Sequence, residues 1–209
     1  MDRWTRFVPL TGVVFVALLV ATFIVSGSTP GSDESGAKVI SFYKDHKNAQ
    51  QASNALGAIA VVFLIFFAGF LRGYLIRSTR AAALAACGFG GAVLIGVGGA
   101  IFSSIGFALA DVPDKLNPAA AQALNVLSND FFFPLAAGAS VFMIANGLAA
   151  VRSGLLPLWL GWIAVVLGVV SVTPVGFFAF LAVMLWVLIV SILLFIRGGR
   201  ALPAVAAAT

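Results

Sequence analysis

The chain has 209 residues, of which 62% are hydrophobic and only 9% are charged. A soluble domain carries about 25% charged residues, so this composition excludes an ordinary soluble protein and predicts an integral membrane protein. The net charge of +5 does not indicate nucleic-acid binding, because the arginines lie near the ends of apolar runs, where they meet anionic lipid headgroups.

The first apolar run covers residues 7–25 and follows a short segment that contains Arg3 and Arg6. A secretory signal has an apolar stretch of about 7–15 residues, and this run of 19 residues is longer. We therefore interpret it as a retained first membrane span rather than a cleaved signal.

A second helical pattern lies in the polar link after this run. Val39, Phe42, Tyr43 and His46 recur at i, i+3, i+4 and i+7, so they share one face of a helix. This spacing predicts a short amphipathic helix that lies in the headgroup region or covers the outer mouth of the bundle.

Five further apolar runs follow, bounded by charged residues, prolines and helix-capping residues. Asn129 and Asp130, for example, suit the N-terminus of the fourth span. The predicted spans after the first are residues 52–71, 81–110, 130–151, 155–172 and 175–196. We expect an all-α bundle of six transmembrane helices in one domain over residues 1–200, with a disordered tail at 201–209.

The basic residues sort by type between these spans. With both termini on one side, the inner links and ends carry +7 and the outer links −2. Because cytoplasmic loops are enriched in Lys and Arg, this partition predicts cytoplasmic N- and C-termini. The inner side holds Arg3, Arg6, Arg72, Arg77, Arg80, Arg152, Arg197 and Arg200, and the outer side holds Lys38, Lys44, Lys47 and Lys115.

Small residues recur every four positions in the third span. Such spacing lets helix backbones approach closely, which is how helices associate in lipid. We expect this helix at the centre of its own bundle, with a dimer interface as the alternative. The residues concerned are Gly88, Ala92, Gly96, Ala100 and Ser104.

An aromatic stripe and one amide suggest a ligand site inside the bundle. Phe63 and Phe67 share a face of the second span with Phe66 and Phe70, and Asn146 is the most polar side chain within the spans. Phe63, Phe67 and Asn146 could line a pocket for a flat apolar molecule; the alternative is that they only pack on neighbouring helices.

The outer links hold the residues that could act in a polar reaction. Tyr43, Asp45, His46 and Asp130 are the candidates for an outer-face hydrolase or metal protein. One histidine cannot supply bis-histidine haem ligation, and it cannot form a zinc site without several carboxylates. No nucleophile-elbow motif is present. We therefore expect no cofactor and no metal, and we favour a protein that is not an enzyme over the outer-face hydrolase or metal protein.

Three short segments carry a resemblance to a known group of proteins. They read FYKDH at 42–46, FFAGFLR at 66–72 and LLPLWLGW at 155–162. The chain resembles an uncharacterised family of small multipass membrane proteins of actinobacteria. The resemblance implies a bacterial inner membrane and the same topology, and it supplies no catalytic residue.

Three functions remain open at this point. The first is a non-enzymatic accessory or structural subunit that acts through helix–helix or outer-loop contacts with a membrane-protein partner or with further copies of itself. The second is a binder or carrier of an apolar or lipid-like molecule held in the bundle. The third is the outer-face hydrolase or metal protein. Charged groups, which mark ion paths, are absent from the middle of the spans, and this argues against an ion-coupled transporter.

Overall fold

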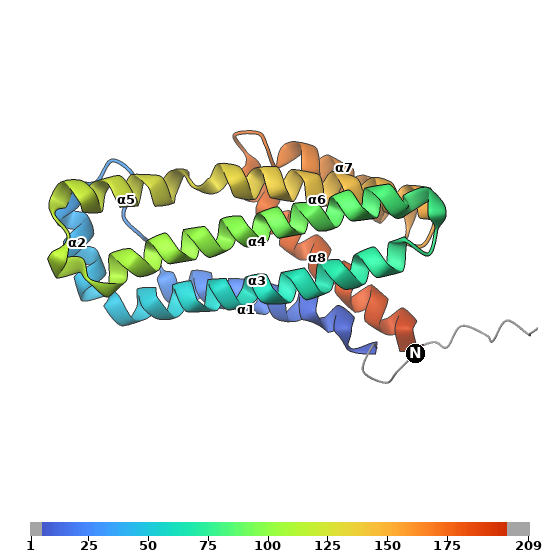
Figure 1. Cartoon of the computed structure of the whole chain (residues 1–209), viewed down its shortest axis with the longest axis horizontal. Coiled ribbons are helices and arrows are strands. Elements are labelled where there is room, and N and C mark those ends of the chain that lie inside the picture. Colours follow the sequence, from blue (N-terminus) through green and yellow to red (C-terminus); the bar gives the residue numbers. More distant parts are fainter. Residues whose placement is uncertain (1–5, 200–209) are drawn as a thin grey trace, which may run out of the picture.

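A computed structural model describes residues 6–199, and no residue in that range forms a β-strand. Figure 1 shows α3, α4 and the collinear pair α5 and α6 as long rods lying side by side, with α8 crossing them obliquely. The predicted all-helical class is confirmed. The helices are α1 (Thr11–Ser26), α2 (Gly36–Asp45), α3 (Lys47–Leu75), α4 (Ala82–Asp111), α5 (Pro118–Asp130), α6 (Phe132–Ser153), α7 (Leu158–Val170) and α8 (Gly176–Gly199), with 3-10 turns η2 (Val8–Leu10), η3 (Thr79–Ala81) and η4 (Pro113–Lys115).

Five helical segments are long and apolar enough to cross a membrane. They are Val8–Ser26, Lys47–Leu75, Thr79–Asp111, Pro118–Ser153 and Phe178–Arg197. The exception is the segment predicted as the fifth span, 155–172, in which the helix α7 has only 13 residues. At 1.5 Å per residue this helix is about 20 Å long, which is shorter than a hydrocarbon core of about 30 Å.

The early end of α7 has a local cause. The Ser171 hydroxyl donates to the carbonyl oxygen of Leu167, and the Thr173 hydroxyl donates to that of Val170. Pro174 then cannot continue a helix because it lacks a backbone N–H. The predicted span ends at residue 172, two residues beyond the end of α7 at Val170.

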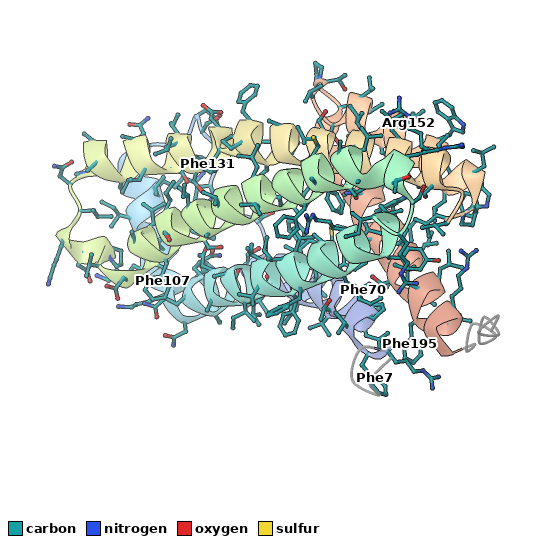
Figure 2. The ribbon with its side chains drawn as sticks, turned by 45° about the vertical axis from the view of Figure 1, so that its right-hand side comes forward. Phe7, Phe70, Phe107, Phe131, Arg152 and Phe195 are labelled. Carbon is teal, nitrogen blue, oxygen red and sulfur yellow. The ribbon has the colours of Figure 1, made fainter. Side chains whose placement is uncertain are left out.

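The two chain ends of the described part lie at the same end of the bundle, which we call the arginine end. The Arg6 guanidinium lies over the Phe195 ring, 5.3 Å from its centroid. The Leu155 carbonyl oxygen accepts hydrogen bonds from Tyr74 and from Arg197, which joins the ends of α3 and α8 to the link between α6 and α7. In Figure 2, Phe7, Arg152 and Phe195 lie toward this end, opposite Phe107 and Phe131.

The opposite end, which we call the lysine end, is closed by α2, α5 and η4. Lys44 forms an ion pair with Asp114 at 2.9 Å, and Lys47 donates to the Asp111 carbonyl oxygen. The predicted short amphipathic helix corresponds to α2, where Val39 and Tyr43 are buried in a small core of their own. The membrane sidedness of the two ends stays a prediction, and Arg3, Arg200 and the predicted tail 201–209 lie outside the described residues.

Helix α4 packs along both α3 and α6. Gly88, Ala92 and Gly96 are buried there, whereas Ala100 and Ser104 are exposed. Each step of four residues advances about 40° around a helix of 3.6 residues per turn, so a strict four-residue stripe rotates out of the contact. The glycine that brings α4 nearest to α6 is Gly91, where a Cβ would overlap the Phe142 backbone nitrogen.

Candidate functional site

A cavity of about 560 Å³ lies in the half of the bundle nearer the lysine end. Its walls come from α1, α3, α4, α5 and α6, and α8 contributes Phe180. Along α3 the lining runs from Gln50 to Val61, a depth of about 17 Å at 1.5 Å per residue. The volume lies within the range of about 300–1,000 Å³ that is usual for small-molecule sites.

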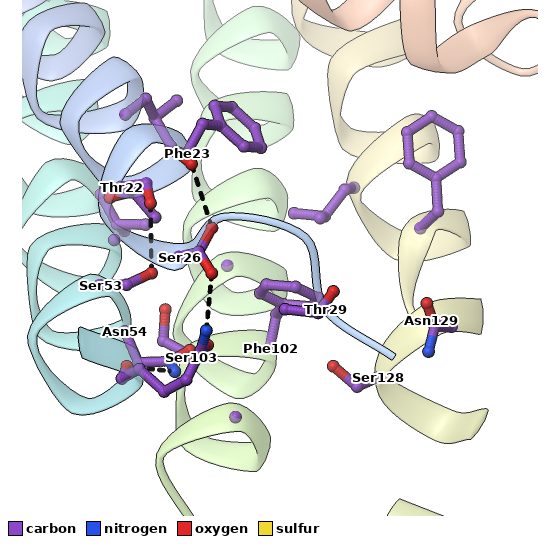
Figure 3. Close-up of a pocket in the computed structure, with 18 of the residues that line it drawn as sticks. Thr22, Phe23, Ser26, Thr29, Ser53, Asn54, Phe102, Ser103, Ser128 and Asn129 are labelled. Carbon is purple, nitrogen blue, oxygen red and sulfur yellow. Dashed lines mark hydrogen bonds between the residues drawn. The ribbon is translucent and has the colours of Figure 1, made fainter. Parts of the chain in front are cut away.

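The polar wall of the cavity begins where α1 ends. The first four and last four residues of a helix leave backbone groups without helical partners, and α3 supplies side chains for the carbonyls of α1. Gln50 donates its amide N–H to the Ser26 carbonyl oxygen at 2.8 Å, and the Ser53 hydroxyl donates to that of Thr22 at 3.3 Å. Both contacts appear in Figure 3. They hold α1 against α3 and fix Gln50 and Ser53 on the lining.

Residues 27–35, the link from α1 to α2, cross the outer side of the cavity, and we call them the strap. Gly27 reverses the chain after α1 with a positive φ of 59°, which favours glycine. Asn125 and Asn129 of α5 donate their amide N–H groups to backbone carbonyls of the strap, at Pro30 and Gly31. In Figure 3 the strap runs from Ser26 past Thr29 toward Ser128 and Asn129.

The deeper wall of the cavity is apolar. It is formed by Phe15 and Leu19 of α1, Val61 of α3, Ile95 of α4, Leu135 of α6 and Phe180 of α8. Polarity therefore changes along the cavity from amides and hydroxyls near the lysine end to hydrocarbon toward the middle of the bundle. A molecule with a polar head and an apolar body matches this gradient.

No residue that lines the cavity is Asp, Glu, Lys, Arg or His. Tyr43 is a titratable lining side chain, and burial raises the pKa of its phenol above the usual value of 10.0, because burial disfavours the charged form. The phenol is therefore neutral at physiological pH. The cavity offers hydrogen bonds without net charge.

The residues predicted to bind a ligand lie elsewhere. Phe67 is fully buried in the main core, Phe63 packs beside it, and Asn146 lies between α6 and α4 with its amide over Gly88. Asn146 donates to the Phe142 carbonyl oxygen of its own helix at 2.8 Å. None of the three lines the cavity.

The outer-face candidates are not assembled into one centre. His46 stacks on Phe42 at 4.5 Å between ring centroids, and Asp45 and Asp130 are exposed. Within residues 6–199, no three His, Cys, Asp or Glu side chains group closely enough to hold a metal ion. Tyr43 points to the other side of α2, where it lines the cavity.

The sequence analysis missed the amides of the cavity. Gln50, Ser53, Asn54 and Gly57 are spaced i, i+3, i+4 and i+7, and all four line the cavity. Asn125, Ser128, Asn129 and Phe132 repeat this spacing on α5 and at the start of α6. The available signal was two helical faces with polar residues, each near the lysine end of an apolar segment.

No protein-family model, no curated protein and no solved structure matches this chain. The site must therefore be interpreted from its own geometry.

Proposed function

We propose that this protein is an integral membrane protein that binds a lipid-like molecule in the cavity at the lysine half of the bundle. The observation that carries the proposal is the polarity gradient: a hydrocarbon-lined depth below a rim of uncharged amides and hydroxyls. Ligand sites are usually apolar clefts with a few placed polar groups that fix orientation. An amphiphile satisfies both parts of this cavity at once.

The arrangement of helices supports six passes with both termini cytoplasmic. Five segments have the length and composition of spans, and both ends of the described part, residues 6–199, lie at the arginine end, which favours an even number of passes. We propose that the short α7 supplies the fifth pass together with the turn 171–175. Because cytoplasmic loops are rich in Arg and Lys, we place the arginine end in the cytoplasm. The resemblance to an actinobacterial family favours the inner membrane of a bacterium.

The short α7 also favours entry from the outer leaflet. Gly176, at the start of α8, lies against the Phe132 ring at the start of α6, so the turn between α7 and α8 stops at that level. Val172 and Val175 are exposed there and suit contact with acyl chains. No side chain of α7 lines the cavity, and Phe180 is the contribution of α8. The polar rim is therefore covered by the strap rather than by these two helices.

The chemistry of the lining favours binding over reaction. General acid–base catalysis needs a group that gains or loses a proton near the working pH. Tyr43 keeps its proton, and the lining contains no carboxylate, histidine, lysine or cysteine. We therefore propose a carrier or receptor, and we expect no turnover of the bound molecule.

The test compares two neighbouring tryptophan variants of α1 after gentle purification. Leu19 lines the cavity, whereas Val20 is 45% exposed on the outer surface of the helix. Native mass spectrometry should detect a retained lipid-like molecule in the wild type and in Val20→Trp, and should not detect it in Leu19→Trp. Equal retention in Leu19→Trp would contradict the proposal. A membrane protein that co-purifies at fixed stoichiometry, with no retained small molecule, would instead support the accessory-subunit role predicted from the sequence.

A further inference from the structure

We infer that the head group of the bound molecule is uncharged and donates hydrogen bonds, as the hydroxyls of a glycerol or sugar head group do. This inference rests on the proposed function and names the class of ligand for the same cavity. It depends on which atoms of the buried amides are already engaged by the protein.

Three lining amides have their nitrogen atoms fixed. Asn54 donates to the Gln50 carbonyl oxygen, Gln50 to that of Ser26, and Asn125 to that of Gly31, each at 2.8 Å. A carbonyl oxygen only accepts hydrogen bonds, so the amide atom facing it must be the NH₂ group. The Asn125 NH₂ group also faces the Pro30 carbonyl oxygen, so the oxygen is the part of that amide left for another partner. Gln50 and Asn54 each keep their side-chain oxygen and one further N–H.

These three oxygens have no partner within the described part of the chain, and neither do the hydroxyls of Tyr43 and Ser103. The five side chains are only 1–8% exposed. Among the described residues, every fully inaccessible polar side-chain atom has a hydrogen-bond partner. Because these five groups have none, they are not fully enclosed. They belong to residues that line one cavity, and the cavity is where a partner would reach them.

The unpaired groups are mostly acceptors. Each amide oxygen has two acceptor sites and no proton, whereas each hydroxyl has one proton to donate. A head group that only accepts, such as an ester or a quinone, would be served by the two hydroxyls and by the second N–H of Gln50 and of Asn54. It would still face three amide oxygens without protons between them. A head group with several hydroxyls can donate to the amide oxygens and accept from Tyr43 and Ser103.

The absence of charged side chains from the cavity lining also favours an uncharged head group. A phosphate or carboxylate buried without a paired cation loses its hydration uncompensated. The nearest lysine-rich cluster, with Lys44 and Lys47, lines a separate surface hollow together with Asp111 and Asp114. Two of its cations are already engaged by Asp114 and by the Asp111 carbonyl oxygen. Because no residue that lines the cavity is a cation, we expect the cavity to disfavour anionic head groups.

The experiment uses the full chain in phosphatidylcholine nanodiscs and three probes that share a twelve-carbon tail. 1-Monolauroylglycerol carries two hydroxyls, methyl laurate only accepts hydrogen bonds, and monododecyl phosphate is anionic. We expect the dissociation constant of monolauroylglycerol to be about five- to thirtyfold lower than those of the other two, since one or two extra hydrogen bonds of about 1 kcal/mol each correspond to that range.

Matched variants separate the head-group contacts from the fold. Asn54→Leu should weaken the binding of monolauroylglycerol about tenfold and that of methyl laurate much less. Asn146→Leu makes the same change outside the cavity and should alter neither probe. Tyr43→Phe removes only a hydroxyl without a partner, so its thermal stability should match the wild type while monolauroylglycerol binds about threefold more weakly.

Two results would overturn different statements. Equal or tighter binding of methyl laurate or monododecyl phosphate overturns the head-group inference and leaves the proposed function standing. If no probe binds, or if Leu19→Trp binds every probe as well as the wild type does, the cavity is not a lipid site and the proposed function fails with it. If Asn54→Leu and Asn146→Leu weaken the binding of all probes equally, the amide oxygens do not bind the head group selectively, and the head-group inference is wrong.

Discussion

Two asparagines lie over glycines of α4 in the same manner, one in each half of the bundle. Asn146 of α6 covers Gly88 near the arginine end, and Asn54 of α3 covers Gly106 near the lysine end. Each donates its amide N–H to the carbonyl oxygen four residues earlier in its own helix, at 2.8 Å. Only Asn54 lines the cavity. The same arrangement of an asparagine over a glycine therefore occurs in the tightly packed half of the bundle, near the arginine end, and in the half that contains the cavity, which we call the open half.

The difference comes from how closely the backbones approach. Around Asn146, α4 and α6 touch through Gly91 and Gly138, and α6 and α7 touch through Gly147 and Gly161, so that an added Cβ would meet backbone atoms of the neighbouring helix. Around Asn54 the neighbours of the glycines on α3 and α4 are side chains, and the strap bridges α1 and α5. Backbone contact leaves no space for a ligand, whereas side-chain contact leaves space that a ligand can use.

The largest effect should come from breaking the backbone contact. In Gly91→Ala the new Cβ would overlap the backbone of Phe142, which cannot move without shifting α6. Overpacking of this kind costs up to about 3 kcal/mol. We expect a loss of that size in the free energy of unfolding, measured by denaturant titration with circular dichroism in mixed micelles.

Gly90→Ala is the matched control for this variant. Gly90 is the adjacent residue, is exposed, and has no neighbouring atom within 4 Å of an added Cβ. Alanine is favoured over glycine in a helix by up to about 1 kcal/mol, so this variant should be as stable as the wild type or more so. A Gly91→Ala protein as stable as Gly90→Ala would show that α4 and α6 do not touch as described.

A smaller effect is expected for the same change in the open half. In Gly106→Ala the Cβ would meet the amide of Asn54, the far end of a side chain that can rotate toward the cavity. We expect a loss of about 1 kcal/mol by the same denaturant titration. Binding of the retained lipid-like molecule should weaken by more than stability falls, because the displaced amide occupies the head-group region. A loss of stability as large as that of Gly91→Ala would show that the helices pack as tightly around Gly106 as around Gly91.

Much of the helix pattern could be predicted from the sequence. Long apolar runs bounded by arginines define α1, α3 and α4, and they do so because the backbone of a membrane segment must satisfy its own hydrogen bonds. The fifth span is predicted to end at residue 172, and α7 ends two residues earlier, at Val170. The difference depends on Ser171 and Thr173, whose hydroxyls bond back to carbonyl oxygens of α7, and hydropathy alone does not show these bonds.

The cavity could be predicted only in part. Spacing alone shows that Gln50, Ser53 and Asn54 share a helix face, and a polar face at the edge of an apolar run is a reason to expect partners. Spacing does not show that Gln50 holds the end of α1 or that Asn125 holds the strap, because those contacts join segments far apart in the sequence. For the same reason the sequence does not show that Asn54 lines the cavity whereas Asn146, the most polar residue within the spans, does not.

The smallest effect on stability is expected at the lysine end, where α2 contributes Tyr43 to the cavity lining. Asp114 accepts a hydrogen bond from the Lys44 ammonium, and this bond, with the attraction between the two charges, raises the pKa of Lys44 above its ordinary 10.5, with a further contribution from the charge of Asp45. A pKa raised by folding means that the pair stabilises the folded state below pH 10.5 and that this contribution is lost as the pH rises through the raised value. Lys44→Gln should therefore lower the unfolding midpoint slightly at neutral pH, and this difference should disappear at high salt and at pH values above the raised pKa.

Both side chains are more than 60% exposed, so the decrease must be far smaller than that of Gly91→Ala. Lys115→Gln, at a lysine with no ion pair among the described residues, should show no such pH dependence. A Lys44→Gln decrease that persists unchanged into alkali would mean that packing of the lysine stem, rather than its charge, holds α2 over the cavity.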